Sequence, residues 1–260
     1  MLDFKQISAK DNRLIKLTAL LQKSSKARKE NSLFVLEGLR ICKDAAENGV
    51  LFDTLILSDS VYENMSDDVL LLCKNADNGA VVRDDLFKKI TDTASPQGII
   101  ALCIMPTQKE SIDNLGRFVA LENIADPANI GAIARTAEAL GIDGIIISGD
   151  SCDIYSPKAL RASMGTLLRM PLYFCDDIIS FLNKNSLRGF ACIPVASADI
   201  SFGNFKFSDG DAVIIGNEAN GLTKTTKIGA YKTVTINMRG SAESLNAAAA
   251  AAIAMWELIK

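Results

Sequence analysis

The chain has 260 residues, of which 48% are hydrophobic and 23% are charged. This composition is typical of a globular protein with a buried core, and the length favours two domains. The chain contains no histidine, which excludes Ser-His-Asp and Cys-His catalysis and any His-ligated metal site. Its six cysteines are scattered without a C-x-x-C pair, so we expect no metal and a reducing, cytoplasmic location. No apolar run is long enough to cross a bilayer, and the first residues do not resemble a secretory signal, so we expect no membrane contact.

The charges are unevenly distributed along the chain. The net charge is −3 overall, yet residues 1–40 hold nine Lys and Arg against four Asp and Glu. A basic end on an acidic body favours contact with a polyanion such as nucleic acid. On charge alone, a solvated surface helix explains the same residues equally well.

Apolar periodicity and turn residues predict alternating helices and strands in the first half of the chain. The first expected element is a helix over 11–30, whose basic end 23–30 is either a helical continuation or a loop. The elements that follow, in order, are a strand over 32–37, a helix over 39–49, a strand over 52–58, a helix over 67–79, a strand over 80–82, a helix over 83–93 and a strand over 98–105. The alternation predicts a small three-layer α/β unit over 30–105. The polar stretch 106–115 breaks the pattern and is the expected linker.

After the linker the alternation restarts. The expected strands cover 116–124, 143–149, 169–174, 188–196, 209–215 and 231–238, and the expected helices cover 129–141, 156–167, 176–185, 223–230 (a short helix or turn) and 244–260. Repeated strand–helix pairs predict a parallel sheet flanked by helices. The signatures of dinucleotide-binding and P-loop phosphate-binding folds are both missing.

The first of three unusual loops follows the strand 116–124. Asp126 and Pro127 form a turn, and Asn129 is positioned to cap the next helix. Arg135 lies on that helix among small residues, which leave a crevice around its guanidinium. The alternative is an ordinary surface arginine with a buried stem.

The second and third loops lie near the end of the chain. Gly216 and Gly221 bracket a polar loop that contains Glu218, whose carboxylate could bind a ligand or an arginine, although such glycine-bounded turns are common. In the third loop, Ser244 is the expected N-cap of a terminal helix whose alanines permit close packing. Capping by Ser244 then leaves the second polar residue at this helix start, Asn246, without an explanation. Because ligands bind at the carboxyl ends of parallel strands, we expect the three loops to form one site.

The blocks NIGAIAR, IGNEANGL and INMRGSAESLN resemble the three signature motifs of the SpoU/TrmH family. Its members are S-adenosylmethionine-dependent RNA ribose 2′-O-methyltransferases of the SPOUT superfamily. The resemblance spans residues 117–260, and residues 8–105 resemble the family's ribosomal-protein-like (L30e-like) substrate-binding domain. It implies an RNA-binding domain over 1–106, a linker over 107–115 and a SPOUT methyltransferase domain over 116–260.

The resemblance also implies a deep trefoil knot in the parallel sheet, formed by the segments around Gly216–Leu222 and Met238–Asn246. The alanine run then gives clearance to a threaded helix. Members of the family are homodimers that associate through the knotted domain, with their sites at the subunit interface.

The family's site residues map onto positions of this chain. The resemblance implies that Arg135 acts on the target 2′-hydroxyl, and we expect it to act as a donor rather than a base because guanidinium almost never loses its proton. The residues implied to orient Arg135 and the ribose are Asn129, Glu218, Ser244 and Asn246. Those implied to bind S-adenosylmethionine are the backbone of Gly216, Ile236, Met238 and Leu245, with Leu121 as a wall.

The basic first domain is expected to bind folded RNA through phosphates and shape. The candidate contacts are Arg13, Lys16, Arg28, Lys29 and Arg40. The two-domain layout resembles enzymes that modify ribosomal RNA, and 23S rRNA is the expected substrate, in a housekeeping or an antibiotic-resistance role. The alternatives are a tRNA 2′-O-methyltransferase, a non-catalytic RNA-binding or ribosome-assembly factor on the same scaffold, and a small-molecule methyltransferase, which has no use for a basic domain.

Overall fold

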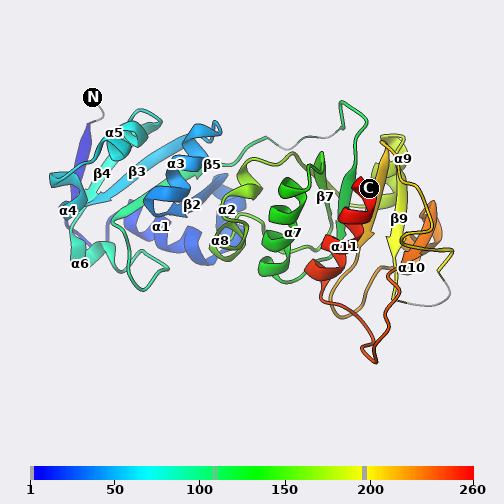
Figure 1. Ribbon diagram of the computed structural model, residues 1–260. Helices are drawn as coiled ribbons and strands as arrows, with labels where there is room; N and C mark the ends of the chain where they lie inside the picture. The colour runs from blue at the N-terminus through cyan, green and yellow to red at the C-terminus, as the bar shows by residue number, and fades with distance from the viewer. Residues whose placement is uncertain (1–2, 108, 110, 195–197) are drawn as a thin grey trace. The chain divides into compact units, whose positions relative to one another are not determined.

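The computed structural model describes residues 3–107, 109, 111–194 and 198–260, and its contacts divide the chain into two units. Unit 1 comprises Met1–Thr107 and Tyr155–Arg169, and unit 2 comprises Gln108–Ile154 and Met170–Lys260 (Figure 1). Residues 108 and 110 of the expected linker, and 195–196 at the end of the expected strand 188–196, lie outside the described residues.

Unit 1 is built on a mixed five-stranded sheet with the order β1-β4-β3-β5-β2. Its strands are β1 (Phe4–Ile7), β2 (Leu33–Glu37), β3 (Phe52–Ser58), β4 (Ala76–Val82) and β5 (Ile99–Ile104). Strand β5 runs antiparallel to both β2 and β3, while β4 is parallel to β1 and β3. The helices are α1 (Arg13–Lys23), α2 (Ser25–Asn31), α3 (Leu39–Glu47), α4 (Asp59–Glu63), α5 (Asp67–Cys73), α6 (Asp84–Phe87), α8 (Pro157–Ser163) and the 3-10 turn η1 (Thr166–Leu168).

The local structure of unit 1 differs from the expectation at Ser24 and at the start of β4. The basic end of the segment 11–30 is helical but forms a separate helix, because the extended backbone of Ser24 ends α1 and its hydroxyl caps α2. Strand β4 begins at Ala76, so the expected helix 67–79 ends early. The polar first residues of β4 form a strand because β1 pairs with β4. The Phe4 ring of β1 packs directly over Gly79 of β4, and a side chain at position 79 would collide with this ring.

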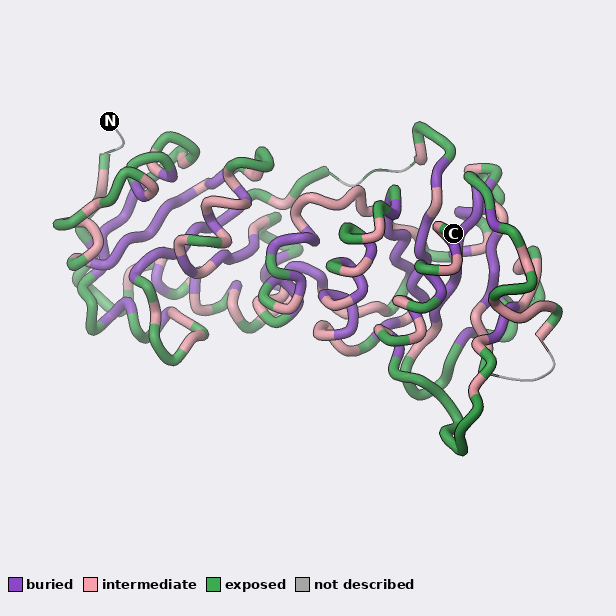
Figure 2. Tube along the Cα trace, viewed as in Figure 1, coloured by how far each residue is buried: buried purple, intermediate pink, exposed green. Residues whose placement is uncertain are grey.

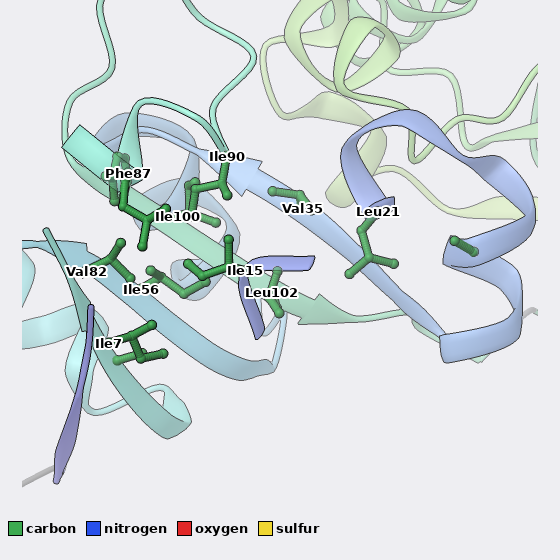
Figure 3. Close-up of a cluster of buried hydrophobic side chains, with 13 residues drawn as sticks. Ile7, Ile15, Leu21, Val35, Ile56, Val82, Phe87, Ile90, Ile100 and Leu102 are labelled. Atoms are coloured by element: carbon green, nitrogen blue, oxygen red, sulfur yellow. The ribbon is translucent and has the colours of Figure 1, made fainter. Parts of the chain in front are cut away.

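The core of unit 1 lies between α1 and the sheet (Figure 3). Ile15 and Leu21 of α1 are buried and pack with Val35 and Leu102 of β2 and β5. Thr18, between them, is also buried and satisfies its hydroxyl on the Leu14 carbonyl. These buried residues therefore fix which face of α1 contacts the sheet.

The segment 155–169 belongs to unit 1 by its contacts, whereas its place in the sequence predicts a helix of the second domain. The ring centroids of Tyr155 and of Phe34 on β2 are 4.9 Å apart. Arg161 forms a 2.7 Å ion pair with Asp92, and Arg169 pairs with Asp44 on α3. Periodicity identifies a helix but not the core that it joins, which is why the sequence places this segment in the domain over 116–260 whereas its contacts belong to unit 1.

Unit 2 contains a seven-stranded sheet in which every described pairing is parallel. Its strands are β6 (Phe118–Glu122), β7 (Gly144–Ser148), β8 (Leu172–Cys175), β9 (Arg188–Cys192), β10 (Ile200–Ser201), β11 (Asp211–Ile215) and β12 (Lys232–Thr235). Strands β6, β7 and β11 are buried along their whole length (Figure 2), as expected for a parallel sheet covered on both faces. This confirms the parallel α/β prediction.

Two helix pairs flank this sheet: α7 (Pro127–Ala139) with α11 (Ala247–Ile259), and α9 (Ile178–Lys184) with α10 (Lys224–Gly229) (Figure 1). The buried alanines of α11 are Ala247, Ala251 and Ala254, at near-helical spacing toward α7 and β11. No helix among the described residues is long and apolar enough to cross a membrane.

The strand order β10-β12-β9-β11-β6-β7-β8 places the functional loops. From β6 the chain proceeds outward through β7 and β8 on one side, while β11 lies on the other. A parallel sheet leaves a crevice at the carboxyl ends where the strand order reverses. The loops that follow β6 and β11 therefore meet at this edge of unit 2.

Candidate functional site

A chain of side-chain hydrogen bonds joins the three sequence motifs at the carboxyl edge of the sheet. Asn129 Nδ2 donates to Glu218 Oε1 at 2.7 Å. Asn246 Nδ2 donates to Asn129 Oδ1 at 3.1 Å. The motifs lie 89 and 117 residues apart in sequence, so the fold has brought together the polar residues that the sequence singled out.

Glu218 ties the loop after β11 to the loop after β6. Besides the Asn129 bond, its carboxylate accepts the backbone N–H groups of Ala125 at 3.1 Å and Asp126 at 3.2 Å. Partial burial on its own would raise the pKa of Glu218, but these donors outweigh burial and hold the pKa below its ordinary value. Glu218 is therefore ionised at neutral pH and acts as an acceptor.

Two capping assignments from the sequence are wrong. The N-cap of α11 is Asn246, whose Oδ1 accepts from the N–H groups of Ala248 and Ala249, whereas Ser244 is exposed and lies two residues earlier. One amide group thus caps the helix through its oxygen and reaches Asn129 through its nitrogen. On α7 the N-cap is Asp126, which leaves the Asn129 side chain free to join the loops.

A cavity of about 560 Å³ opens beside this hydrogen-bond chain, within the size range of small-molecule sites in proteins. Residues from the ends of β9, β11 and β12 and from the start of α11 surround it. Five residues that the sequence assigned to the cofactor or the reaction line it beside Glu218: Gly216, Ile236, Met238, Ser244 and Leu245. Leu121 does not line the cavity, because it is fully buried within β6 beside Ile215.

The loop of the second motif closes tightly on itself. The Cβ of any residue larger than glycine at 216 would lie 2.4 Å from the backbone of Gly221 and Leu222, and Gly221 has a positive φ of 65°. Within the loop, Asn217 Oδ1 accepts the N–H groups of Ala219 and Asn220. These contacts fix one wall of the cavity without any ligand.

Sequence reasoning missed Glu122, which anchors the far end of this loop. Its side chain, at the carboxyl end of β6, is buried and accepts hydrogen bonds from Thr223 N at 2.7 Å, Thr223 Oγ1 at 3.0 Å and Thr226 Oγ1. An acidic residue at the end of an otherwise apolar strand was the available signal. A buried carboxylate needs such donors.

Arg135 is exposed on α7 and has no hydrogen bond or ion pair with any described residue. It lies six residues after Asn129, which at 3.6 residues per turn places the two side chains roughly 120° apart around the helix. Within one copy of the chain, the hydrogen-bond chain therefore does not hold Arg135. The expectation that Asn129 and its partners orient Arg135 is not met by these contacts.

The basic candidates of unit 1 fall into two groups. Arg13, Lys16, Lys29 and Arg40 are exposed. Arg28 is 3% exposed, and its guanidinium donates to the carbonyls of Leu21 and Gln22 in the last turn of α1. Its assignment as an RNA contact is therefore wrong: Arg28 satisfies the end of a helix.

The described part of the chain contains no cluster of three or more Cys, Asp or Glu side chains that could hold a metal ion. The candidate site therefore consists of the cavity, the three-motif hydrogen-bond chain and the Glu122 anchor. Its residues offer an ionised acceptor, amide groups and aliphatic walls.

Residues 116–256 match the family model of the SpoU rRNA Methylase family, which covers more than half of the chain. The chain belongs to the SpoU rRNA methylase family. Residues 12–101 match the MRM3-like substrate binding domain. Both matches agree with the resemblance carried by the sequence motifs.

Similar proteins cover nearly the whole chain. The 23S rRNA (guanosine(2553)-2′-O)-methyltransferase RlmP of Bacillus subtilis is 26% identical over 259 residues, which cover 98% of this chain and 99% of the relative. The 23S rRNA (uridine(2479)-2′-O)-methyltransferase of Streptomyces viridochromogenes is 28% identical over 270 residues, covering 98% and 92%.

Solved structures of SpoU and rRNA methyltransferases are also similar to this chain over nearly its whole length. The SpoU methyltransferase AviRb from Streptomyces viridochromogenes in complex with AdoMet superposes with a TM-score of 0.85 at 25% identity, covering 95% of this chain and 97% of that one. The AdoMet-bound rRNA methyltransferase from Sinorhizobium meliloti gives a TM-score of 0.86 at 25% identity, covering 98% and 97%.

Proposed function

We propose that this protein is an S-adenosylmethionine-dependent 2′-O-methyltransferase of 23S ribosomal RNA. The observation that carries the proposal is the Glu218–Asn129–Asn246 hydrogen-bond chain, which joins all three family motifs beside a cavity of about 560 Å³. The relatives that align with both units act on 23S rRNA by name, which favours ribosomal RNA over tRNA. We place its action in the cytoplasm, because the described cysteines are all free.

The cavity residues fit S-adenosylmethionine chemically. Aliphatic side chains suit an adenine ring, and the charged groups of Lys227 and Glu243 on the lining suit the carboxylate and ammonium of its methionyl end. When bound, the cofactor supplies an electrophilic methyl group on its sulfonium. The segments Gly216–Leu222 and Met238–Asn246 that line this cavity are the ones we propose to form the trefoil knot.

The residues of this chain contribute positioning and electrostatics. Asn129, Glu218 and Asn246 keep the three loops in one arrangement, with Ser244 at the rim of the cavity. Arg135 supplies N–H donors to the RNA phosphate and to the 2′-oxygen as negative charge develops on it.

We propose that Arg135 reaches the site across a homodimer interface. Its exposure, and its position away from Asn129 on α7, give it no partner among the described residues of its own chain. The neighbouring helix α11 exposes Ile253 and Trp256, and apolar side chains of this kind are typical of interface cores. A second copy that covers α7 and α11 would therefore bring an arginine to each site.

Unit 1 binds the RNA in this proposal. Its exposed basic residues Arg13, Lys16, Lys29 and Arg40 suit phosphate contacts, and binding should weaken as salt rises. A non-catalytic RNA-binding factor is disfavoured, because the hydrogen-bonded residues of the three motifs are all present.

A direct test is methyl transfer from labelled S-adenosylmethionine to unmodified 23S rRNA, followed by mapping of 2′-O-methyl sites. Arg135→Ala should abolish transfer while cofactor affinity, measured by calorimetry, stays unchanged. Normal transfer by this variant would refute the role of Arg135. A wild-type protein that binds no cofactor would refute the enzyme proposal itself.

A further inference from the structure

Unit 1 contains a second cavity, of about 390 Å³, that methyl transfer does not explain. It lies between β2, the start of α3 and the segment 155–169. Its volume is within the range of pockets that hold small organic groups. The lining residues used below are Gln22, Ile41, Gln97, Leu160, Met164 and the arginines Arg40, Arg161 and Arg169.

The cavity combines aliphatic walls with two amide groups. Ile41, Leu160 and Met164 provide apolar surface. Gln97 accepts the Leu39 N–H through Oε1 at 2.9 Å, and Gln22 donates through Nε2 to a backbone carbonyl at 3.3 Å. Each amide is thus fixed at one end, and its other end offers a donor or an acceptor to a ligand.

The lining carries three arginines and two carboxylates, Glu37 and Asp44, and the Glu37 carboxylate accepts the Asp92 N–H and the Thr93 hydroxyl. Arg161 is paired with Asp92 at 2.7 Å, and Arg169 is paired with Asp44. Arg40 is exposed and has no hydrogen bond or ion pair with any described residue. The cavity therefore presents a free guanidinium, the group best suited to bind phosphate.

The wall on the α8 side is held in an unfavourable backbone conformation. Met164 has a φ of 50°, a region that costs a non-glycine residue roughly 1 kcal/mol. The next residue, Gly165, passes so close to α3 that a Cβ would lie 2.3 Å from Asp44 Oδ2. Met164 ends α8 as its left-handed C-cap, and the residue is 50% exposed on the cavity wall.

We propose that this cavity binds one unpaired nucleotide of the RNA substrate, with the base against Ile41 and Met164 and the phosphate at Arg40. The inference rests on the proposed function, because it takes RNA as the substrate. Proteins read RNA mainly through splayed-out bases, which are held by hydrogen bonds to their edges and by contacts to their faces. The two glutamine amides match base edges, and the free guanidinium matches the backbone.

Methyl-labelled methionine gives separate NMR probes of the two cavities. Met164 lines the cavity of unit 1 and Met238 lines that of unit 2, and each signal is assigned from its Met→Leu variant. A single-stranded RNA oligonucleotide should shift the Met164 signal, and S-adenosylmethionine alone should shift Met238. The methyl signal of Met65, which lines neither cavity, is the internal reference.

Arg40→Ala should weaken the RNA-induced shift of Met164 about tenfold in apparent affinity, as expected for a lost charged hydrogen bond. It should also reduce the salt dependence of binding by about one phosphate contact. The Met238 response to S-adenosylmethionine should not change. Arg83→Ala is the matched control, because Arg83 is an exposed arginine of unit 1 that does not line the cavity.

Three results would overturn the inference. RNA could leave the Met164 signal unmoved, Arg83→Ala could weaken binding as much as Arg40→Ala, or a free mononucleotide could bind as tightly as the oligonucleotide, which would indicate a metabolite site. None of these would affect the proposed function, which fails only if Met238 does not respond to S-adenosylmethionine or the wild-type protein does not methylate rRNA.

Discussion

At the residue scale, two carboxylates hold the loop that forms one wall of the proposed cofactor cavity. Glu218 binds the loop after β6 through three donors, and Glu122 holds the start of α10 through Thr223 and Thr226. The loop between them is therefore fixed at both ends before a ligand arrives. Such preorganisation lowers the entropic cost of binding.

Thr226→Val tests the Glu122 anchor. Thr226 is fully buried, and its loss leaves the buried carboxylate with one donor fewer, which should cost about 1–3 kcal/mol in the free energy of unfolding. Affinity for S-adenosylmethionine should fall as well. Urea unfolding and calorimetry measure the two effects. In Thr136→Val, which removes only a hydroxyl bonded within α7, both quantities should stay near the wild-type values, and equal losses in the two variants would contradict the anchor.

The lowered pKa of Glu218 predicts a pH dependence of stability. Its folded-state pKa lies below the ordinary value of 4.5, so its stabilising contribution is fully present above that pH and is lost as pH falls through the folded-state pKa. Wild type should thus exceed Glu218→Gln in stability at pH 7 by a margin that shrinks below about pH 4.5. Urea unfolding of both proteins across this range checks the trend, and a constant margin would contradict it.

At the element scale, continuous apolar strands and a periodic helix could be predicted, and interrupted or short edge elements could not. The strands β6, β7 and β11 and the helix α7 follow the pattern of their apolar residues. Strand β1 was missed because its four residues alternate weakly and gain stability only by pairing with β4. The break at Ser24 could not be placed, because the pattern left residues 23–30 open between a helical continuation and a loop.

The sequence predicted which residues belong to the site better than it predicted their hydrogen-bond partners. The motifs identified Asn129, Glu218 and Asn246, but not which oxygen caps a helix and which nitrogen crosses to another loop. Sequence spacing likewise could not reveal that Arg28 is buried under α1. Such outcomes depend on tertiary geometry that local propensity does not contain.

The alanine helix α11 permits a packing test. Ala251 is completely buried and Ala249 is exposed. Ala251→Leu should destabilise the protein by about 1–3 kcal/mol or more, because the extra methyl groups have no space beside α7 and β11. Ala249→Leu introduces the same side chain and should change stability by less than about 0.5 kcal/mol. Urea unfolding that ranks the two variants equally would contradict close packing along this stripe.

At the scale of the whole molecule, the proposed homodimer links the exposed face of α7 and α11 to activity. If a second copy covers this face, neither Arg135 nor Trp256 is exposed in the working enzyme. Loss of the dimer would then remove catalysis without disturbing the cofactor cavity.

Ile253→Glu tests this arrangement. A charge placed in an apolar interface should dissociate the dimer and abolish methyl transfer, while S-adenosylmethionine still binds. Ile228→Glu places the same charge on α10, where the isoleucine is 74% exposed, and should leave both properties intact. Analytical ultracentrifugation measures the assembly state, and a monomeric wild type would rule out the arrangement.

The assignment of residues 155–169 to unit 1 has a consequence for how the molecule can be divided. The chain passes from one unit to the other at three places, after residues 107, 154 and 169, so no single cut separates them. A fragment that ends at residue 107 lacks the ring partner of Phe34 and the guanidinium partners of Asp92 and Asp44. Transfer of unit 1 from this chain to another protein should therefore include both 1–107 and 155–169, because the first segment alone lacks these partners.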